Sequence, residues 1–111
     1  MNDRLLSFLG ICRRAKKLVI GAETAVESMK DGKSQLVLYA SDFSKGSLKK
    51  VLEASGRCGV EALALPRTKE ELSLALGRLS GVLSVEDKGF ADKLRELINS
   101  KQRGEFDENK G

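Results

Sequence analysis

Histidine and tryptophan are both missing from the 111-residue chain. Without histidine there is no imidazole to act as a general base or as a metal ligand, so chemistry that needs either is excluded. Aromatic residues are also few, with one tyrosine and four phenylalanines spread along the sequence. Proteins that stack single-stranded bases on aromatic side chains need more of them, and that class of binding protein is disfavoured.

Cysteine is nearly as scarce. Cys12 and Cys58 lie far apart, and two cysteines make neither a disulfide framework nor a zinc site. We expect both to be buried free thiols that pack as small hydrophobic side chains. No apolar run approaches the roughly 18 residues that a membrane span needs, and Met1 to Arg4 lack the pattern of a signal peptide. The sequence therefore predicts a soluble protein of the reducing cytoplasm with no membrane partner.

Residues that could carry catalysis are not arranged for it. The serines Ser44, Ser47 and Ser55 have no histidine to activate them. Asp42 and Glu23 lie at expected helix starts, where carboxylates usually act as caps. Neither a Walker motif nor a G-x-G-x-x-G motif occurs. We therefore expect no enzyme, no cofactor, no metal site and no small-molecule substrate.

Hydrophobic periodicity divides the chain into alternating helices and short strands. The first helix is expected to begin after Asn2 as N-cap, and Thr68 with Glu71 forms a capping box before the fourth. The expected strands are 18–20, 36–40, 60–65 and 82–85; the expected helices are 5–16, 22–32, one around 48–52 that closes near Gly56 or Gly59, one from 68 to 76, and one from 87 to 99.

This order predicts one domain of class α/β, spanning residues 1–100. Strands that alternate with helices form a central sheet covered on both faces, an α/β/α sandwich. The continuous apolar run Leu36–Ala40 is typical of a strand buried on both faces. In the polar segment 101–111, charges of both signs cancel and the periodicity ends, so we expect a disordered tail.

Charged residues show a modest positive excess. The chain has 20 Lys and Arg against 16 Asp and Glu, a net charge of +4. Such an excess favours an anionic partner, because Lys and Arg neutralise phosphates and release counterions. Cations gather at the end of the first helix and along the third: Arg13, Arg14, Lys16 and Lys17, then Lys45, Lys49, Lys50 and Arg57.

One local feature suits a phosphate. Gly21 lies between the strand 18–20 and the helix that begins near Ala22. A helix N-terminus offers free N–H groups and partial positive charge, and glycine lets another backbone approach closely. The cations Arg14, Lys16 and Lys17 lie just upstream and could flank the same edge. A glycine between strand and helix is also common for purely structural reasons, so both interpretations stay open at this point.

The order of these motifs resembles a known family. Residues 9–23, LGICRRAKKLVIGAE, are similar to the bacterial YlxQ-like branch of the L7Ae-type ribosomal protein superfamily, which also includes L30e-type, S12e-type and Gadd-like proteins. Further matches are Asp31-Gly32-Lys33, Asp42, Lys49-Lys50, 68–72 (TKEEL) and 85–91 (VEDKGFA). The resemblance extends from Leu5 to Leu97. It implies a three-layer α/β/α sandwich around a four-stranded mixed sheet, and a non-catalytic protein that binds RNA.

The best-known members of the superfamily bind kink-turn RNA, and the resemblance transfers their contacts to specific positions. The glycine and helix start fall on Gly21, Ala22, Glu23 and Thr24, and a second contact falls on the loop Gly77 to Gly81, with Gly77, Arg78 and Ser80 as site residues. Phosphates would be held by Arg13, Arg14, Lys16, Lys17 and Lys30. The expected partner is structured RNA, ribosomal or kink-turn-like, bound by a monomer.

This sequence departs from the kink-turn pattern. The family's Asn and Glu fall on Glu23 and Thr24, its Leu-Gly dipeptide on Leu72-Ser73, and a nearby cation on Glu27. A carboxylate cannot donate as an amide does, and it repels phosphate. General RNA binding therefore survives better than kink-turn recognition. Two alternatives stay open: a protein–protein module, which the acidic residues would suit, and an accessory domain of an RNA-modifying enzyme.

Overall fold

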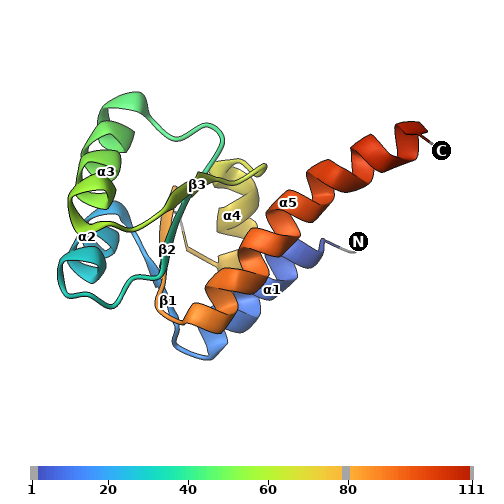
Figure 1. Cartoon of the computed structure of the whole chain (residues 1–111). Coiled ribbons are helices and arrows are strands. Elements are labelled where there is room, and N and C mark those ends of the chain that lie inside the picture. Colours follow the sequence, from blue (N-terminus) through green and yellow to red (C-terminus); the bar gives the residue numbers. More distant parts are fainter. Residues whose placement is uncertain (1–2, 79–80, 111) are drawn as a thin grey trace.

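The computed structural model describes residues 3–78 and 81–110. Helices and strands alternate along them as the periodicity predicts (Figure 1). The elements are α1 (Arg4–Arg14), β1 (Leu18–Ile20), α2 (Ala22–Lys30), β2 (Leu36–Tyr39), α3 (Lys45–Cys58), β3 (Ala62–Ala64), α4 (Lys69–Leu76), β4 (Val82–Val85) and α5 (Lys88–Lys110).

The strands form one mixed sheet in the order β1-β4-β2-β3. The central strand β4 is antiparallel to both neighbours, with Leu83 opposite Ile20 on one side and opposite Leu38 on the other. Strands β2 and β3 are parallel. The predicted four-stranded mixed sheet is therefore confirmed within the described residues.

Helices cover both faces of this sheet, as the α/β/α prediction requires (Figure 1). Side chains alternate across each strand, so Leu38 and Leu83 pack in the core beneath α1, α4 and α5. Val37 and Val82 pack in the core beneath α2 and α3. The run Leu36–Ala40 is continuously apolar because both of its faces are covered.

A chain of buried hydroxyls ties α2 to the sheet. Ser84, which is fully buried in β4, donates from Oγ to Ser34 Oγ at 2.7 Å and lies 2.9 Å from Ser28 Oγ. Ser28 in turn donates to Glu86 Oε2 at 2.6 Å. The chain satisfies hydroxyls that would otherwise be costly to bury and fixes the C-terminal half of α2 on β4.

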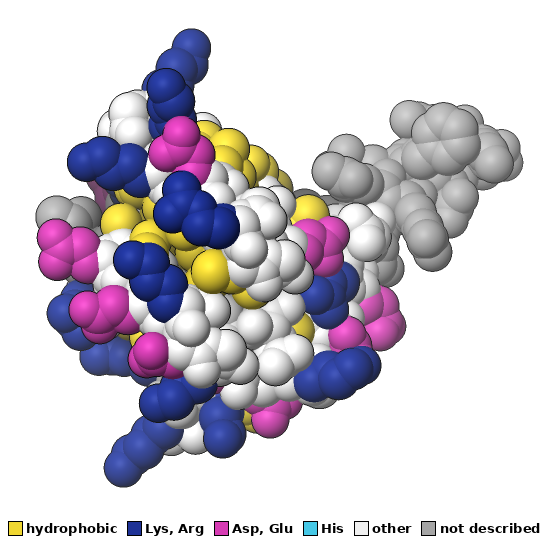
Figure 2. All heavy atoms as spheres, turned by 60° about the vertical axis from the view of Figure 1, so that its left-hand side comes forward, with side chains coloured by type: hydrophobic (Ala, Val, Ile, Leu, Met, Phe, Trp, Pro, Cys, Tyr) yellow, Lys and Arg dark blue, Asp and Glu magenta, His cyan; other side chains and the backbone are white. Residues whose placement is uncertain are grey.

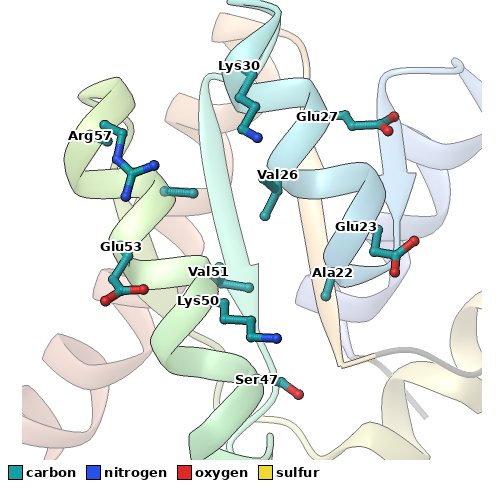
Figure 3. Close-up of a pocket in the computed structure, with 11 residues that line it drawn as sticks. Ala22, Glu23, Val26, Glu27, Lys30, Ser47, Lys50, Val51, Glu53 and Arg57 are labelled. Carbon is teal, nitrogen blue, oxygen red and sulfur yellow. The ribbon is translucent and has the colours of Figure 1, made fainter.

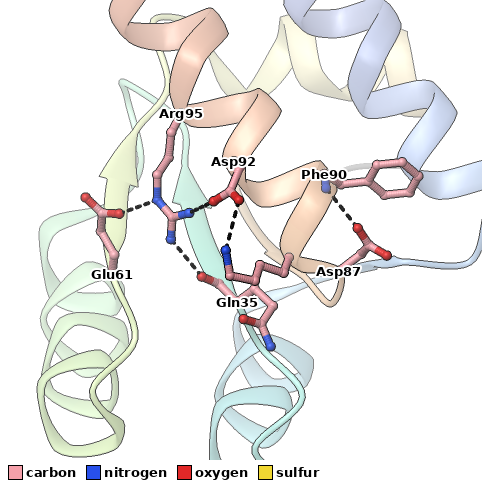
Figure 4. A network of polar contacts seen from close by, with 7 residues as sticks. Gln35, Glu61, Asp87, Phe90, Asp92 and Arg95 are labelled. Carbon is pink, nitrogen blue, oxygen red and sulfur yellow. Dashed lines mark hydrogen bonds and ion pairs between the residues drawn. The ribbon is translucent and has the colours of Figure 1, made fainter.

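Arg95 fastens α5 to the sheet edge (Figure 4). Its guanidinium donates to Glu61 Oε1 at 2.6 Å, to the Gln35 carbonyl at 3.0 Å and to Asp92 Oδ1 at 2.8 Å. The Asp87 carboxylate accepts from the backbone N–H of Phe90 at 2.8 Å and so caps the start of α5. The backbone of α5 is helical to Lys110, although the apolar periodicity that predicts the helix ends near residue 99.

Several local predictions need correction. Asn2 lies outside the described residues, and Asp3 caps α1 by accepting from the Leu6 N–H at 3.0 Å. Asp42 does not cap α3, where Ser44 is the N-cap; it accepts instead from the Lys69 N–H at 2.8 Å and so caps α4 across a loop. The capping box predicted at the start of α4 is confirmed.

The prediction for the cysteines is half right. Cys12 is buried on the inner side of α1, whereas Cys58 is exposed because it lies in the last turn of α3, at the helix end. Among the described residues no three cysteine, aspartate or glutamate side chains are grouped to hold a metal ion. No helix in that part of the chain is long and apolar enough to cross a membrane.

Candidate nucleic-acid interface

Gly21 makes the junction between β1 and α2. It is the N-cap of α2, with φ 117° and ψ 147°, and no side chain caps the first turn. This backbone conformation is essentially restricted to glycine. A Cβ at Gly21 would also lie 2.9 Å from Thr24 Oγ1. The helix therefore starts with backbone N–H groups that no side chain covers, a suitable arrangement for an anion.

The Thr24 side chain stabilises this junction through hydrogen bonds. Its hydroxyl lies 2.7 Å from the carbonyl of Ile20 and 3.2 Å from the carbonyl of Gly21, and donates to them. The hydroxyl proton is thus used within the protein, and only the oxygen lone pairs are left for a ligand. The neighbouring Glu23 is exposed and carries the negative charge of the first turn of α2.

The loop between α4 and β4 ends beside Gly21. It begins at Gly77, the left-handed C-cap of α4 with φ 69°, and returns to the sheet at Gly81. The Ala40 N–H donates to the Gly81 carbonyl at 2.8 Å, and the Gly21 N–H donates to the next carbonyl, that of Val82, at 2.9 Å. A Cβ at Gly81 would overlap the ring of Phe43. Gly21 and the end of this loop at Gly81 are therefore adjacent.

Two arginines of the predicted site lie near the start of this loop. Arg13 donates from Nη1 to the carbonyl of Leu76, and so places a cation at the C-terminus of α4, where the helix dipole favours it. Its guanidinium has further N–H groups for a phosphate. Arg78 follows Gly77 and is exposed, as is Arg14. Ser80 lies outside the described residues.

Lys16 and Lys17 are not brought to the Gly21 edge. The Lys17 carbonyl accepts from the Glu86 N–H at 2.8 Å, at the end of β1 where Leu18 pairs with Val85. Three residues of extended chain lie between Lys17 and Gly21, which puts the two about 13 Å apart. Lys30 is also distant, because it ends α2 about 12 Å from Ala22 along the helix axis. The predicted cations thus form more than one group.

The structure adds a groove that the sequence did not assign. It lies between α2 and α3, has a volume of about 540 Å³, and is shown in Figure 3. The sequence does contain a pattern that indicates one side of the groove, because Ser47, Lys50, Ala54 and Arg57 follow helical spacing on α3. What the spacing did not show is that this stripe faces α2. The lining residues are Ala22, Glu23, Val26, Glu27, Lys30, Ser47, Lys50, Val51, Glu53, Ala54 and Arg57.

The surface over these helices is cationic around an apolar hollow. Figure 2 shows Lys and Arg side chains grouped around apolar atoms on this side of the molecule, with fewer acidic side chains between them. The ion pairs among the described residues, such as Asp3–Arg67 and Glu61–Arg95, lie elsewhere. The cations of this face are therefore available to an anionic ligand.

Comparison with known proteins agrees with the family resemblance. The model of the ribosomal protein L7Ae/L30e/S12e/Gadd45 family matches residues 3–95. RNA-binding protein YlxQ of Enterococcus faecium is 30% identical over 97 residues, which cover 87% of this chain and 93% of that protein. RNA-binding protein YlxQ of Bacillus subtilis (strain 168) is 33% identical over 96 residues, covering 82% and 91%.

Two solved structures have the same arrangement of elements. A protein with unknown function from Bacillus halodurans C superposes with a TM-score of 0.81 at 31% identity, covering 88% of this chain and 99% of that one. The 15.5kD RNA binding protein of Giardia lamblia superposes with a TM-score of 0.66 at 21% identity, covering 90% and 89%. At that lower identity the second likeness supports the fold alone.

Proposed function

Because the chain belongs to the ribosomal protein L7Ae/L30e/S12e/Gadd45 family, we propose that it binds structured RNA and catalyses no reaction. One observation carries the proposal: the uncapped N-terminus of α2 at Gly21 lies against the end of the α4–β4 loop. Backbone N–H groups at a helix start bind phosphate, and a neighbouring loop can read the shape of the RNA. Two relatives carry the name RNA-binding protein, and this chain covers more than four-fifths of the length of each.

The contacts divide into two kinds. Arg13 and Arg78 supply charge-assisted contacts to phosphates near the loop, and Arg14 adds a contact from the side of α1. Such contacts position the RNA without reading its sequence. Gly21, Ala22, Glu23 and Thr24 lie against the RNA at the helix start. Lys16, Lys17 and Lys30 would reach phosphates only in an RNA large enough to span more than one end of the sheet.

The RNA that we propose is ribosomal or kink-turn-like, with a weakened kink-turn preference. Glu23 offers only acceptors, and the Thr24 hydroxyl already donates to the carbonyls of Ile20 and Gly21. Neither residue can therefore reproduce the donors of a side-chain amide. Glu27 adds repulsion towards any phosphate near the exposed side of α2. We further propose that the protein acts as a cytoplasmic monomer.

A titration at two salt concentrations tests this proposal. The purified chain is mixed with a model kink-turn, with total ribosomal RNA and with an unrelated duplex. Salt-sensitive binding to ribosomal RNA is expected, and kink-turn binding that resists the duplex competitor would assign the finer specificity. Absence of binding to all three RNAs would refute the proposal.

A protein–protein role is the second candidate, and the exposed carboxylates Glu23 and Glu27 favour it. Acidic side chains at the rim of an interface suit a basic protein surface better than they suit phosphate. A pull-down with the tagged chain discriminates the two. Partners that all survive nuclease treatment would support this second function, and partners lost with the RNA would support the first.

A further inference from the structure

The groove between α2 and α3 opens at the proposed RNA edge. Both helices begin at the same end, so that Ala22 lies across the groove from Ser47 (Figure 3). The first turn of α3 contains no acidic residue and begins with Lys45, so its positive dipole end is not neutralised there. A strand of RNA that leaves the N-terminus of α2 therefore meets the entrance of this groove.

Three cations line the groove. In Figure 3 the side chains of Lys30 and Lys50 point towards the space between the helices, whereas those of Glu23 and Glu27 point away from it. Arg57 and Glu53 lie along α3, with Glu53 between Lys50 and Arg57. None of the three cations forms an ion pair within the described part of the chain. The two carboxylates of α2 are thus turned out of the groove, and of the acidic lining residues only Glu53 stands beside the three cations.

The distribution of these cations fits a chain of phosphates better than one anion. Lys50 and Arg57 are seven residues apart on α3, which corresponds to about 10 Å along the axis, and Lys30 lies at the far end of α2. Between them the floor consists of aliphatic side chains, including Val26 and Val51, and Glu53 is the one carboxylate that α3 adds to the lining. Such a floor accepts ribose but offers no aromatic face for stacking a base.

We propose that the groove between α2 and α3 binds the phosphodiester backbone of a single-stranded RNA segment that continues from the Gly21 edge. Lys50 and Arg57 contact its phosphates from α3, and Lys30 does so from α2. These contacts add affinity and a path for the strand, not sequence recognition. The inference rests on the proposed function, because the strand must first be held at Gly21.

An acidic amphipathic helix is the competing occupant. It would need a broad apolar floor, and the groove offers two valines and two alanines. The groove is also continuous with the proposed RNA edge, and a bound peptide would give no reason for that continuity. RNA is therefore the occupant that the groove favours.

The test uses one structured RNA with and without a single-stranded extension, and the double variant Lys50→Ala with Arg57→Ala. The matched control is Arg4→Ala with Lys93→Ala, which removes the same charge from α1 and α5 on the other side of the sheet. All four residues are exposed. Thermal unfolding monitored by circular dichroism verifies that each variant folds.

Each single-stranded phosphate contact contributes about 0.7 to the slope of log K against log salt. The groove variant should therefore lose about 1.4 of the slope and about 25-fold in affinity at 0.1 M salt for the extended RNA. It should bind the RNA without the extension as tightly as the wild type does. The control variant should leave the difference in affinity between the two RNAs unchanged.

The outcomes separate the two proposals. If the wild type binds neither RNA, the proposed function and this inference both fail. If the wild type binds but the groove variant is unaffected, or loses affinity equally for both RNAs, only the groove inference fails. Competition by an acidic peptide as strong as that by RNA of equal charge would assign the groove to a protein and overturn the inference.

Discussion

Replacing Gly21 by alanine tests the junction on which the proposed RNA edge depends. The backbone of Gly21 has φ 117° and ψ 147°, a conformation that costs a residue with a side chain about 1–3 kcal/mol. The new Cβ would lie 2.9 Å from Thr24 Oγ1. Thr24 must then move, and losing its hydrogen bond to the Ile20 carbonyl costs about 1 kcal/mol more. The expected loss of unfolding free energy for Gly21→Ala is about 2–4 kcal/mol.

Equilibrium unfolding in urea measures this loss, and two further variants show where it originates. Gly46→Ala is the matched control, because nothing lies within 4 Å of its Cβ position. Alanine favours helix over glycine by up to about 1 kcal/mol, so this control should not lose unfolding free energy. A double-mutant cycle with Thr24→Ala isolates the contact between Cβ and hydroxyl. A change below about 0.5 kcal/mol for Gly21→Ala, the size of an ordinary surface substitution, would refute the reasoning.

Two changes of surface charge and one buried thiol test other parts of the structure. Glu27→Lys should strengthen RNA binding and raise the salt slope by about 1 in a titration, and an unchanged affinity would mean that this side of α2 does not approach RNA. Lys16→Glu with Lys17→Glu should weaken binding to ribosomal RNA but not to an RNA too short to reach the far end of β1, as parallel titrations can show. Burial raises the pKa of the Cys12 thiol to about 11, so above pH 9 the unfolded chain loses a proton that the folded chain keeps. Stability should then fall by about 2 kcal/mol between pH 9 and 11, and Cys12→Ala should remove this fall, whereas Cys58→Ala should not.

Most of the fold was predictable because local signals agree with tertiary burial. The run Leu36–Ala40 predicts a strand covered on both faces, and β2 lies inside the sheet with helices on either side. Thr68 and Glu71 make their predicted capping box because that motif depends on only four consecutive residues. The order of the strands, by contrast, depends on contacts between segments more than 40 residues apart.

The site was less predictable than the fold. The resemblance selected Gly21 and the loop from Gly77 to Gly81, and the structure shows Gly21 hydrogen-bonded to Val82, the residue that follows this loop. Lys16 and Lys17 are close to Gly21 in sequence, yet an intervening strand carries them to the other end of the sheet. To predict the groove, one would have to know that α2 and α3 lie side by side, and no sequence pattern within either helix shows this.

The exposure of Cys58 was missed for a similar reason. A cysteine in an amphipathic helix is usually buried, but the residue lies in the last turn of α3, where Gly59 already turns the chain away in a left-handed conformation. The exposure of Cys58 therefore follows from its position at the helix end and not from the general preference of cysteine for the protein interior.

The central place of β4 has a consequence for the protein as it is synthesised. Strand β1 pairs with β4 on one side and β2 pairs with it on the other, so a nascent chain shorter than about 85 residues has no partner for β1 in the native sheet. Only β2 and β3 can pair before then, with part of the core exposed. Cotranslational folding should therefore be completed late, when the last third of the chain has left the ribosomal tunnel, and chains that stop before Val82 should be targets for proteolysis.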